Sequence, residues 1–337
     1  MSQTVTLIPG DGIGPSITEA TVRVIEASGA DLRWDRKEAG VAALQLHNTP
    51  IPDETLASIK ETRVSLKGPL TTPSGTGFRS INVALRKEFD LYANVRPART
   101  IVPGGRYEDI DLVLIRENTE GLYSGVEHYV GIGSDPRAAA ESVMLVTRFG
   151  VERIVRYAFE YALSHGRKKV TLAHKANILK YTQGLFLDIG REIAKEYEGR
   201  VEFEDRIIDA TAMMLVMDPY RFDVIVCENM FGDILSDQIA GLVGGLGLAP
   251  GANIGKDAAI FEAVHGSAPD IADKGIANPA ALMLAAVMML RHLGMHDQAG
   301  RIQTALETTI REGDSLTPDL GGTGTTVSFT DAILRRL

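Results

Sequence analysis

The segment Thr4-Val-Thr-Leu-Ile8 is followed by Pro9-Gly-Asp-Gly-Ile-Gly-Pro15 and then by a helical pattern of apolar residues from Ser16 to Ala27. The first segment is β-rich, the glycines permit a tight turn, and the third segment has helical periodicity. This order predicts a strand, a turn and a helix. The three glycines of the turn lack the G-x-G-x-x-G spacing of the conventional dinucleotide fold, so a ligand-free turn and a cofactor loop both remain open.

Similar β-runs recur along the chain and mostly alternate with segments of helical period. They span residues 63–67, 112–116, 169–173, 201–208 and 223–228. This alternation predicts an α/β protein with a largely parallel sheet. Residues 121–136 are glycine-spaced and β-leaning, which favours an arm or hairpin, whereas residues 241–255 and 320–326 are predicted to be glycine-rich loops.

The length and composition limit the class of protein. A chain of 337 residues fits two domains or one large α/β unit with an insertion, and its formal net charge of −9 disfavours nucleic acid or an anionic membrane as the main partner. The longest apolar run, Ala280 to Leu290, is too short to span a bilayer and predicts a buried helix. The single cysteine, Cys227, and the lack of a recognisable leader lead us to expect a cytoplasmic location and no chemistry at that thiol.

Asp233 and Asp237 stand four residues apart and would share one face of a helix. Two carboxylates there repel each other unless a cation lies between them, so a divalent ion is one interpretation. Two solvated aspartates near a helix N-terminus is the other, with about equal weight. Asp209 closes the β-run at Ile207-Ile208, and the carboxyl end of a strand is a typical position for a functional side chain.

Three arginines, Arg86, Arg96 and Arg116, lie in otherwise mixed sequence, and Ser80 and Asn82 precede the first. A surface salt bridge is the commoner role for any one arginine. Together, however, they would suit a small substrate with several carboxylates, because a guanidinium pairs bidentately with a carboxylate.

Tyr123 and Lys175 are the candidate proton carriers. Lys175 follows a β-run, where burial or a nearby metal can lower a lysine pKa, although an exposed lysine is the commoner finding. His265-Gly266 most often marks a capped turn.

Taken together, these segments resemble the β-decarboxylating dehydrogenases, the isocitrate and isopropylmalate dehydrogenase family. The resemblance covers nearly the whole chain and rests on long motifs in order: residues 8–15, 67–73, 90–97, 116–121, 229–237, 265–269 and 320–322. The pattern Ser80-x-Asn82-x-x-x-Arg86 resembles the isocitrate branch, and residues 174–178 and 268–272 resemble its NAD-dependent, catalytic-subunit type.

The resemblance implies a two-domain fold that shares one long sheet and is not a conventional Rossmann fold. Residues 1–98 and 255–337 would form a large domain on the coenzyme side. Residues 99–254 would form a small domain for dimerisation, metal and substrate, with residues 121–145 as an arm that interlocks with a second subunit. It implies a homodimer with shared active sites, or a higher oligomer.

The resemblance also assigns roles to individual residues. Tyr123 and Lys175 would be catalytic, and Mg²⁺ or Mn²⁺ would be bound by Asp233, Asp237 and a partner's Asp209. The residues implied to bind substrate are Ser80, Asn82, Arg86, Arg96, Arg116 and Asn177. The residues implied to bind NAD are Thr71, Thr72, Glu262, His265, Gly266, Asp270, Ile271 and Asn278.

The implied reaction is the oxidative decarboxylation of isocitrate to 2-oxoglutarate and CO₂, dependent on NAD and a metal. Lys175 would take the hydroxyl proton and Tyr123 would protonate the enolate after decarboxylation. Asp270 would favour NAD, because a 2′-phosphate would bring negative charge against its carboxylate. The alternatives are a homoisocitrate or isopropylmalate dehydrogenase, which Ser80 and Asn82 disfavour, and a noncatalytic regulatory subunit of a hetero-oligomeric enzyme.

Overall fold

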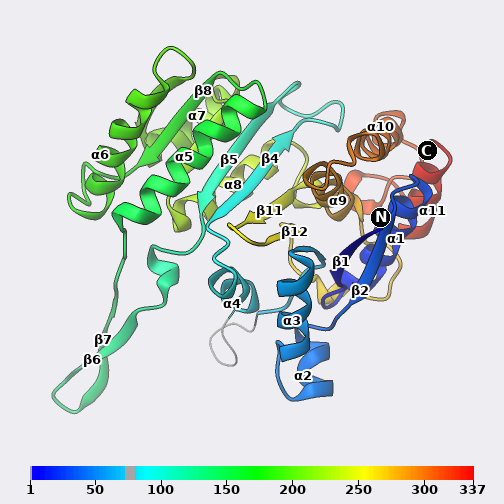
Figure 1. The fold of residues 1–337 in the computed structure, drawn as a ribbon, viewed down its shortest axis with the longest axis horizontal. Coiled ribbons are helices and arrows are strands. Elements are labelled where there is room, and N and C mark those ends of the chain that lie inside the picture. The colour runs from blue at the N-terminus through cyan, green and yellow to red at the C-terminus, as the bar shows by residue number, and fades with distance from the viewer. Residues whose placement is uncertain (1, 73–79) are drawn as a thin grey trace. The chain divides into compact units, whose positions relative to one another are not determined.

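A computed structural model of the chain describes residues 2–72 and 80–337. Pro73, the last residue of one of the quoted motifs, lies outside these ranges. The chain divides into two compact units (Figure 1). Unit 1 comprises residues 1–91, 99–109 and 240–337, and unit 2 comprises residues 92–98 and 110–239. The predicted domains assign residues 92–98, 99–109 and 240–254 the other way round.

Unit 1 begins with the predicted strand, turn and helix: β1 (Gln3–Ile8) leads into α1 (Gly14–Ala27). Gly10 and Gly12 have φ of +82° and +57°, and a Cβ there would lie 2.2 and 2.1 Å from the carbonyl oxygens of Pro69 and Ser267. Only glycine allows so close an approach of three backbone segments. The glycine cluster therefore serves the packing of this turn.

The strands of unit 1 follow the order β2-β1-β3-β12-β11. Their bounds are Leu32–Arg36 for β2, Val64–Lys67 for β3, Ala259–Ala263 for β12 and Pro250–Ile254 for β11. The pairs are parallel except β11 with β12. Besides α1, the described residues of this unit form the helices α2 (Val41–His47), α3 (Asp53–Thr62), α4 (Ile81–Glu88), α9 (Ala280–His292), α10 (His296–Glu312) and α11 (Thr326–Leu334).

The strands of unit 2 follow the order β4-β5-β10-β8-β9. They are β4 (Ala93–Arg99), β5 (Asp111–Glu117), β10 (Val224–Cys227), β8 (Lys169–His174) and β9 (Glu202–Ile207). The pairs β5 with β10, β10 with β8 and β8 with β9 are parallel, and β10 is completely buried. The helices are α5 (Arg148–Ser164), α6 (Thr182–Ala194), α7 (Ile208–Met217) and α8 (Asn229–Leu242). Both units thus confirm the predicted α/β class.

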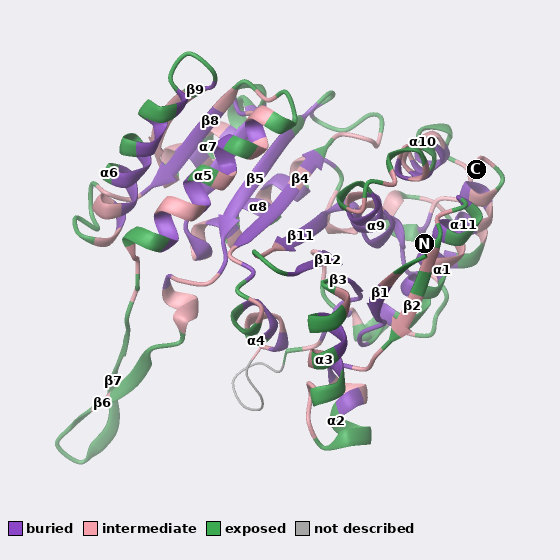
Figure 2. Ribbon diagram, in the orientation of Figure 1, coloured by how far each residue is buried: buried purple, intermediate pink, exposed green. Residues whose placement is uncertain are grey.

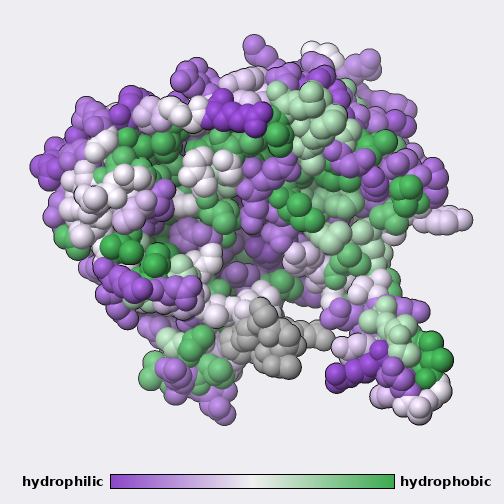
Figure 3. All heavy atoms as spheres, turned by 180° about the vertical axis from the view of Figure 1, so that it is seen from behind, coloured by the Kyte–Doolittle hydropathy of each residue, from purple (hydrophilic) through white to green (hydrophobic). Residues whose placement is uncertain are grey.

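A two-stranded hairpin leaves unit 2, formed by β6 (Glu127–Ile132) and β7 (Asp135–Ser142). A bridge between Gly121 and Leu145 closes its base. Every residue of β7 is exposed, and apolar and polar side chains mix on the hairpin's surface (Figures 2 and 3). The predicted arm is therefore a hairpin that packs little against its own chain.

Two local predictions are wrong. Residues 241–255 are not one glycine-rich loop, because residues 250–254 form β11, whose antiparallel pairing with β12 outweighs their weak β-propensity. Asp209 does not close a strand but lies in the first turn of α7, since β9 ends at Ile207. The described residues contain no helix long and apolar enough to cross a membrane. The predicted buried helix is α9, whose residues 280–283 are completely buried.

Candidate active site

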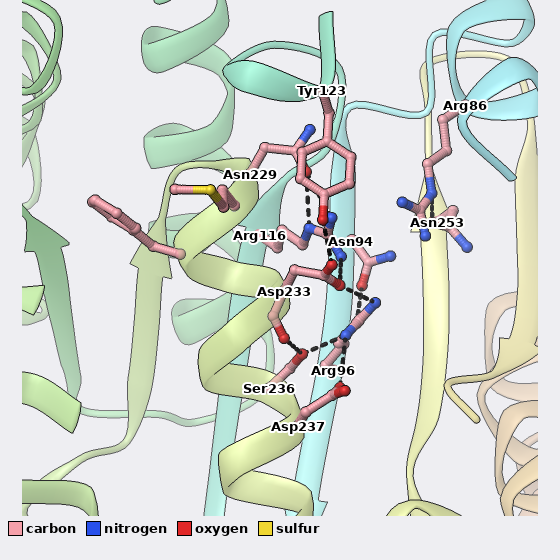
Figure 4. Close-up of polar contacts among 12 residues, drawn as sticks. Arg86, Asn94, Arg96, Arg116, Tyr123, Asn229, Asp233, Ser236, Asp237 and Asn253 are labelled. Atoms are coloured by element: carbon pink, nitrogen blue, oxygen red, sulfur yellow. Dashed lines mark hydrogen bonds and ion pairs between the residues drawn. The ribbon is translucent and has the colours of Figure 1, made fainter. Parts of the chain in front are cut away.

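In unit 2, Arg116 at the end of β5 meets Tyr123 and Asp233 (Figure 4). Arg116 contacts Asp233 through Nη1, and the Tyr123 hydroxyl donates to Asp233 Oδ2 at 2.6 Å. The Arg116 guanidinium also lies over the Tyr123 ring, 5.2 Å from its centre. Gly232 allows this approach, because a Cβ there would lie 2.5 Å from Arg116 Cγ. The helix α8 thus carries both a carboxylate and the glycine that gives the arginine access to it.

Arg96, on β4, approaches the same face of α8 (Figure 4). Its Nη2 lies 3.6 Å from Asp233 Oδ1, and its Nη1 lies 3.7 Å from Asp237 Oδ1 and bonds to Ser236. The Arg96 Nε donates to Asn94 Oδ1 at 2.9 Å. The predicted spacing of Asp233 and Asp237 therefore places both on one helix face, with two arginines and a tyrosine around them.

The two carboxylates of this cluster remain accessible. The side chains of Asp233 and Asp237 are 39% and 56% exposed, whereas those of Arg96 and Arg116 are 10% and 1% exposed. Burial raises the pKa of the Asp237 carboxyl, Arg96 opposes that shift, and Asp233 adds to it. Buried cations beneath open carboxylates form a site that can take both an anionic ligand and a cation.

Lys175 lies in the turn after β8 and pairs with Asp209 through Nζ. Two buried side chains hold the backbone of this turn: Gln183 accepts from the Lys175 N–H at 3.2 Å, and His174 Nδ1 accepts from the Ala176 N–H at 3.1 Å. The other ring nitrogen of His174 lies 3.4 Å from Asp205. The turn is therefore fixed from inside, while Asn177 on it is exposed.

Asp209 is not brought to the other two predicted metal ligands. Within the described part of the chain, no three His, Cys, Asp or Glu side chains gather in a group that could hold a metal ion. One copy of the chain supplies Asp233 and Asp237 together, and Asp209 with Lys175 separately.

In unit 1, Arg86 on α4 belongs to a buried charge cluster with Lys67, Asn253 and Glu262. Glu262 lies 2.6 Å from Lys67 Nζ and 3.6 Å from Arg86 Nη2, and accepts from Asn253 Nδ2 at 2.7 Å. Although burial opposes ionisation, Lys67 and Arg86 hold the Glu262 pKa at about 2. The implied coenzyme residue Glu262 is thus paired inside the protein.

Ser80 and Asn82 flank the start of α4. Ser80 Oγ accepts from the Val83 N–H at 3.4 Å and so caps the helix, which leaves its own hydroxyl proton to donate. Asn82, Arg86, Lys67 and Glu262 line one small pocket. The structure therefore brings Asn82 together with Arg86 in this pocket, whereas Ser80 caps the same helix and is not among the pocket's lining residues.

The other implied coenzyme residues lie in the loops of unit 1. Thr71 bonds to Ser267 at 2.7 Å, and its N–H donates to Asp11, which also accepts from Val41 N–H. Asn278 uses both polar ends internally, on Asp319 and on the Ala280 N–H. Thr72, Gly266 and Asp270 are exposed, and Ile271 is half-buried.

Among the implied coenzyme residues that the structure describes, His265 has a buried polar side-chain atom without a hydrogen-bond partner. Its Nδ1 donates to the Gly266 carbonyl at 2.9 Å, so Nε2 is an acceptor, and that atom is buried with no partner among the residues that the structure describes. Burial lowers the His265 pKa and favours this neutral form. A donor group of a ligand, such as an amine or a hydroxyl, would satisfy it.

Sequence reasoning missed the polar residues that orient these groups. Asn94, Asn229, Asn253, Ser236 and Lys67 all contact a predicted arginine or its partner. The one available signal was their position in or beside the quoted motifs. Nothing in the local sequence indicates which asparagine faces which arginine.

The family model for isocitrate/isopropylmalate dehydrogenase matches residues 4–333. The chain belongs to this family. A crystal structure of isocitrate dehydrogenase from Methylococcus capsulatus superposes with a TM-score of 0.96 at 58% identity, covering 99% of both chains. Isocitrate dehydrogenase [NAD] catalytic subunit 5 of Arabidopsis thaliana is 50% identical, over 99% of this chain and 88% of the relative. A mitochondrial regulatory subunit of the Dictyostelium discoideum NAD isocitrate dehydrogenase is 47% identical, over 99% and 92%.

This membership confirms the resemblance and the fold type implied by it. It also corrects one expectation. The cytoplasmic location is wrong, because these curated relatives of the family are mitochondrial subunits. A single cysteine disfavours an oxidising compartment but does not distinguish one reducing compartment from another.

Proposed function

We propose that the chain catalyses the NAD-dependent oxidative decarboxylation of isocitrate to 2-oxoglutarate and CO₂. The observation that carries the proposal is the open cluster in unit 2, where Arg96, Arg116 and Tyr123 converge on Asp233 and Asp237. It combines cations for substrate carboxylates, a proton donor and hard oxygen ligands. Relatives named NAD isocitrate dehydrogenases, about half identical along the whole chain, support the same reaction.

The residues present fit a divalent cation. Asp233 and Asp237 offer hard, partly exposed carboxylate oxygens one helical turn apart, as Mg²⁺ or Mn²⁺ prefers. Asp209 would complete the set from a partner subunit. When bound, the ion supplies positive charge beside the substrate hydroxyl and α-carboxylate, which lowers the pKa of that hydroxyl.

The protein's own groups then bind the substrate and move its protons. Arg86, Arg96 and Arg116 bind its carboxylates, while Ser80 and Asn82 select the γ-carboxylate and a partner's Asn177 adds a contact. A partner's Lys175 takes the proton of the C2 hydroxyl as hydride leaves C2. After the β-carboxylate departs as CO₂, Tyr123 protonates the enolate. Its hydroxyl already donates to Asp233 at 2.6 Å, which holds that proton at the site.

The loops of unit 1 fit NAD, which when bound accepts the hydride. The support is the orphaned Nε2 of His265, which an amine or hydroxyl of the adenosine could satisfy. Thr71, Thr72, Gly266, Ile271 and Asn278 would line the same groove, and Glu262 would lie at its inner end. Asp270 would accept hydrogen bonds from ribose hydroxyls and repel a 2′-phosphate.

The coenzyme assignment is tested by kcat/KM for NAD and NADP. The wild-type chain should strongly prefer NAD. The double variant Asp270→Lys, Ile271→Tyr should shift the preference toward NADP, because it replaces a carboxylate with a cation. Equal use of both coenzymes by the wild type would contradict the role of Asp270.

A homodimer with shared active sites is the assembly proposed, with the hairpin as its interlocking arm. Large apolar side chains are exposed on the hairpin, on the turn after β8, and on α7 and α8, where a second subunit could cover them. They are Tyr129, Ile132, Ile178, Tyr181, Met213, Met217 and Ile234. Mixing Lys175→Met and Asp233→Asn chains should restore some activity, since each heterodimer would contain one intact site. No recovery after proven subunit exchange would argue against shared sites.

The catalytic activity is tested by assaying the purified chain alone with isocitrate, homoisocitrate and isopropylmalate, each with NAD and a divalent metal. Isocitrate should be the preferred substrate. A preference for another acid would support the other branches of the family. No turnover without a second type of chain would favour a regulatory role, which stays open because one relative is named a regulatory subunit.

A further inference from the structure

The three arginines predicted to bind substrate share one unexpected feature. In each, the guanidinium Nε donates to the side-chain carbonyl of an asparagine: Arg86 to Asn253 at 3.2 Å, Arg96 to Asn94 at 2.9 Å, and Arg116 to Asn229 at 3.0 Å. All six residues are buried, with the asparagines at most 2% exposed. The asparagines come from a different element each time, namely β11, β4 and the start of α8.

The position of this bond has a geometric consequence. Nε is the atom at which the planar guanidinium joins its flexible stem, so a bond there fixes the plane of the group. Arg116 is held at two points, because its Nη2 also donates to Asn229 Oδ1, at 2.7 Å. Both Nη groups of Arg96 and the remaining Nη1 of Arg116 face Asp233 and Asp237. The anchor therefore sets the direction of the groups that would meet a carboxylate.

The chemistry of the anchor matters as much as its position. An amide oxygen accepts a hydrogen bond but carries no net charge, whereas a carboxylate in the same place would neutralise the guanidinium. Arg191 provides the contrast within this chain, because its Nε and Nη2 bond to the carboxylate of Asp205 at 3.0 and 3.1 Å. That pair lies at the surface and involves none of the predicted substrate residues.

Two of the asparagines are themselves oriented by their amide nitrogens. Asn229 Nδ2 donates to the Glu120 carbonyl at 3.0 Å, and Asn253 Nδ2 donates to Glu262 at 2.7 Å. With the amide NH₂ committed to an acceptor, the carbonyl end must face the arginine. The orientation of each of these two anchors is thus built into the surrounding structure.

We propose that Asn94, Asn229 and Asn253 are positioning residues that anchor the three substrate arginines without neutralising them. The inference rests on the proposed function, since it assumes that the arginines bind substrate carboxylates. It assigns to three asparagines a role in substrate affinity, carried out through the arginines and without contact to the substrate.

Asn94 gives the sharpest test, through Asn94→Ala and Asn94→Asp. The alanine variant removes the anchor of Arg96, and the aspartate variant keeps an acceptor but adds a negative charge. Both should raise KM for isocitrate about tenfold, because each weakens a hydrogen-bonded charge interaction, while KM for NAD stays near the wild-type value. If the anchor served only structure, Asn94→Asp would retain the wild-type KM.

A second measurement does not depend on activity. The Nε–H proton of Arg96, followed by NMR in the chain without substrate, should exchange slowly with water and become fast in Asn94→Ala. Arg191 Nε–H should be unchanged in that variant and serves as the internal control. Asn253→Ala repeats the test on Arg86 if Asn94→Ala does not fold.

The outcomes separate the two proposals. If the wild type fails to oxidise isocitrate but the Arg96 proton loses protection in Asn94→Ala, the proposed function is wrong and the anchor stands. Unchanged exchange in Asn94→Ala, or a wild-type KM for isocitrate in that variant, overturns the anchor. A wild-type KM in Asn94→Asp overturns the requirement for a neutral anchor.

Discussion

The buried cluster around Glu262 in unit 1 and the open cluster around Asp233 in unit 2 are built from the same parts. Each has an arginine anchored by an asparagine and paired with a carboxylate. They differ in exposure, since the side chain of Glu262 is 8% exposed and that of Asp233 is 39% exposed. The same type of ion pair is therefore buried in unit 1, whereas its carboxylate is accessible to solvent in unit 2.

This difference indicates what each carboxylate can do. A buried carboxylate must keep its cationic partners, because an unpaired charge in the interior is strongly destabilising. A partly exposed carboxylate can exchange an arginine for a metal ion where the buried arginine receives a substrate carboxylate in its place. We infer that Glu262 mainly maintains the structure around Arg86, whereas Asp233 is free to change partners.

The largest effect is expected for Glu262→Gln. Removing this charge leaves Lys67 buried without its carboxylate, which should lower the free energy of unfolding by about 3–5 kcal/mol. Urea unfolding followed by circular dichroism measures it. The double variant Lys67→Met, Glu262→Gln should recover part of the loss, because it leaves no unpaired lysine. A single variant as stable as the wild type would show that the two clusters do not differ in this way.

The same variant predicts a pH effect. The Glu262 pKa in the folded chain is lowered from 4.5 to about 2, so its ionised form stabilises the fold. This contribution is fully present above the unfolded pKa of 4.5 and is lost as the pH falls toward about 2. Wild-type stability should therefore decline across this window by more than that of Glu262→Gln. Parallel curves would contradict the assignment.

Asp233→Asn and Asp237→Asn should show a different balance, with a smaller loss of stability than Glu262→Gln, because these carboxylates are partly exposed, and a large loss of activity. Partners of metal ligands already cost 10- to 100-fold when changed, so a direct ligand should cost at least about 100-fold. Excess Mg²⁺ or Mn²⁺ should restore part of the activity, because neutralising one ligand weakens metal binding. Wild-type activity at limiting metal would remove these aspartates from the metal site.

The turn after β8 repeats the contrast on a smaller scale, with a buried His174 beneath the accessible Lys175. His174→Ala removes the acceptor of the Ala176 N–H, and the displaced turn should lower kcat for isocitrate by about tenfold. His174→Asn is the matched control, since its Oδ1 can take the place of Nδ1. Equal loss in both variants would indicate that the ring, and not this hydrogen bond, is what matters.

Much of the fold was predictable because it depends on local patterns. Strand β1, helix α1 and the buried helix α9 follow directly from β-propensity, glycine turns and apolar periodicity. Strand β11 was not predictable, because glycine and proline residues form it only where β12 supplies a partner. Pairing between distant segments leaves no local signature.

The candidate site was likewise predictable only in its locally determined features. The shared face of Asp233 and Asp237 follows from helical spacing alone. The contacts that orient the arginines join residues far apart in the chain, such as Arg116 with Asn229 and Arg86 with Asn253. These contacts depend on which strands become neighbours, so residue type and spacing could suggest the arginines but not their anchors.

The sole cysteine makes it possible to follow the local opening of the unit 2 core by chemical labelling. Cys227 lies in the central strand β10 with no exposed surface, and burial raises the pKa of its thiol. A thiol reagent should therefore react with the folded chain only when β10 opens. Because the chain carries no second thiol to obscure the signal, the alkylation rate at low denaturant would measure the opening free energy of that strand. Repeating the measurement with bound ligand would then show by how much ligand binding raises the opening free energy of β10.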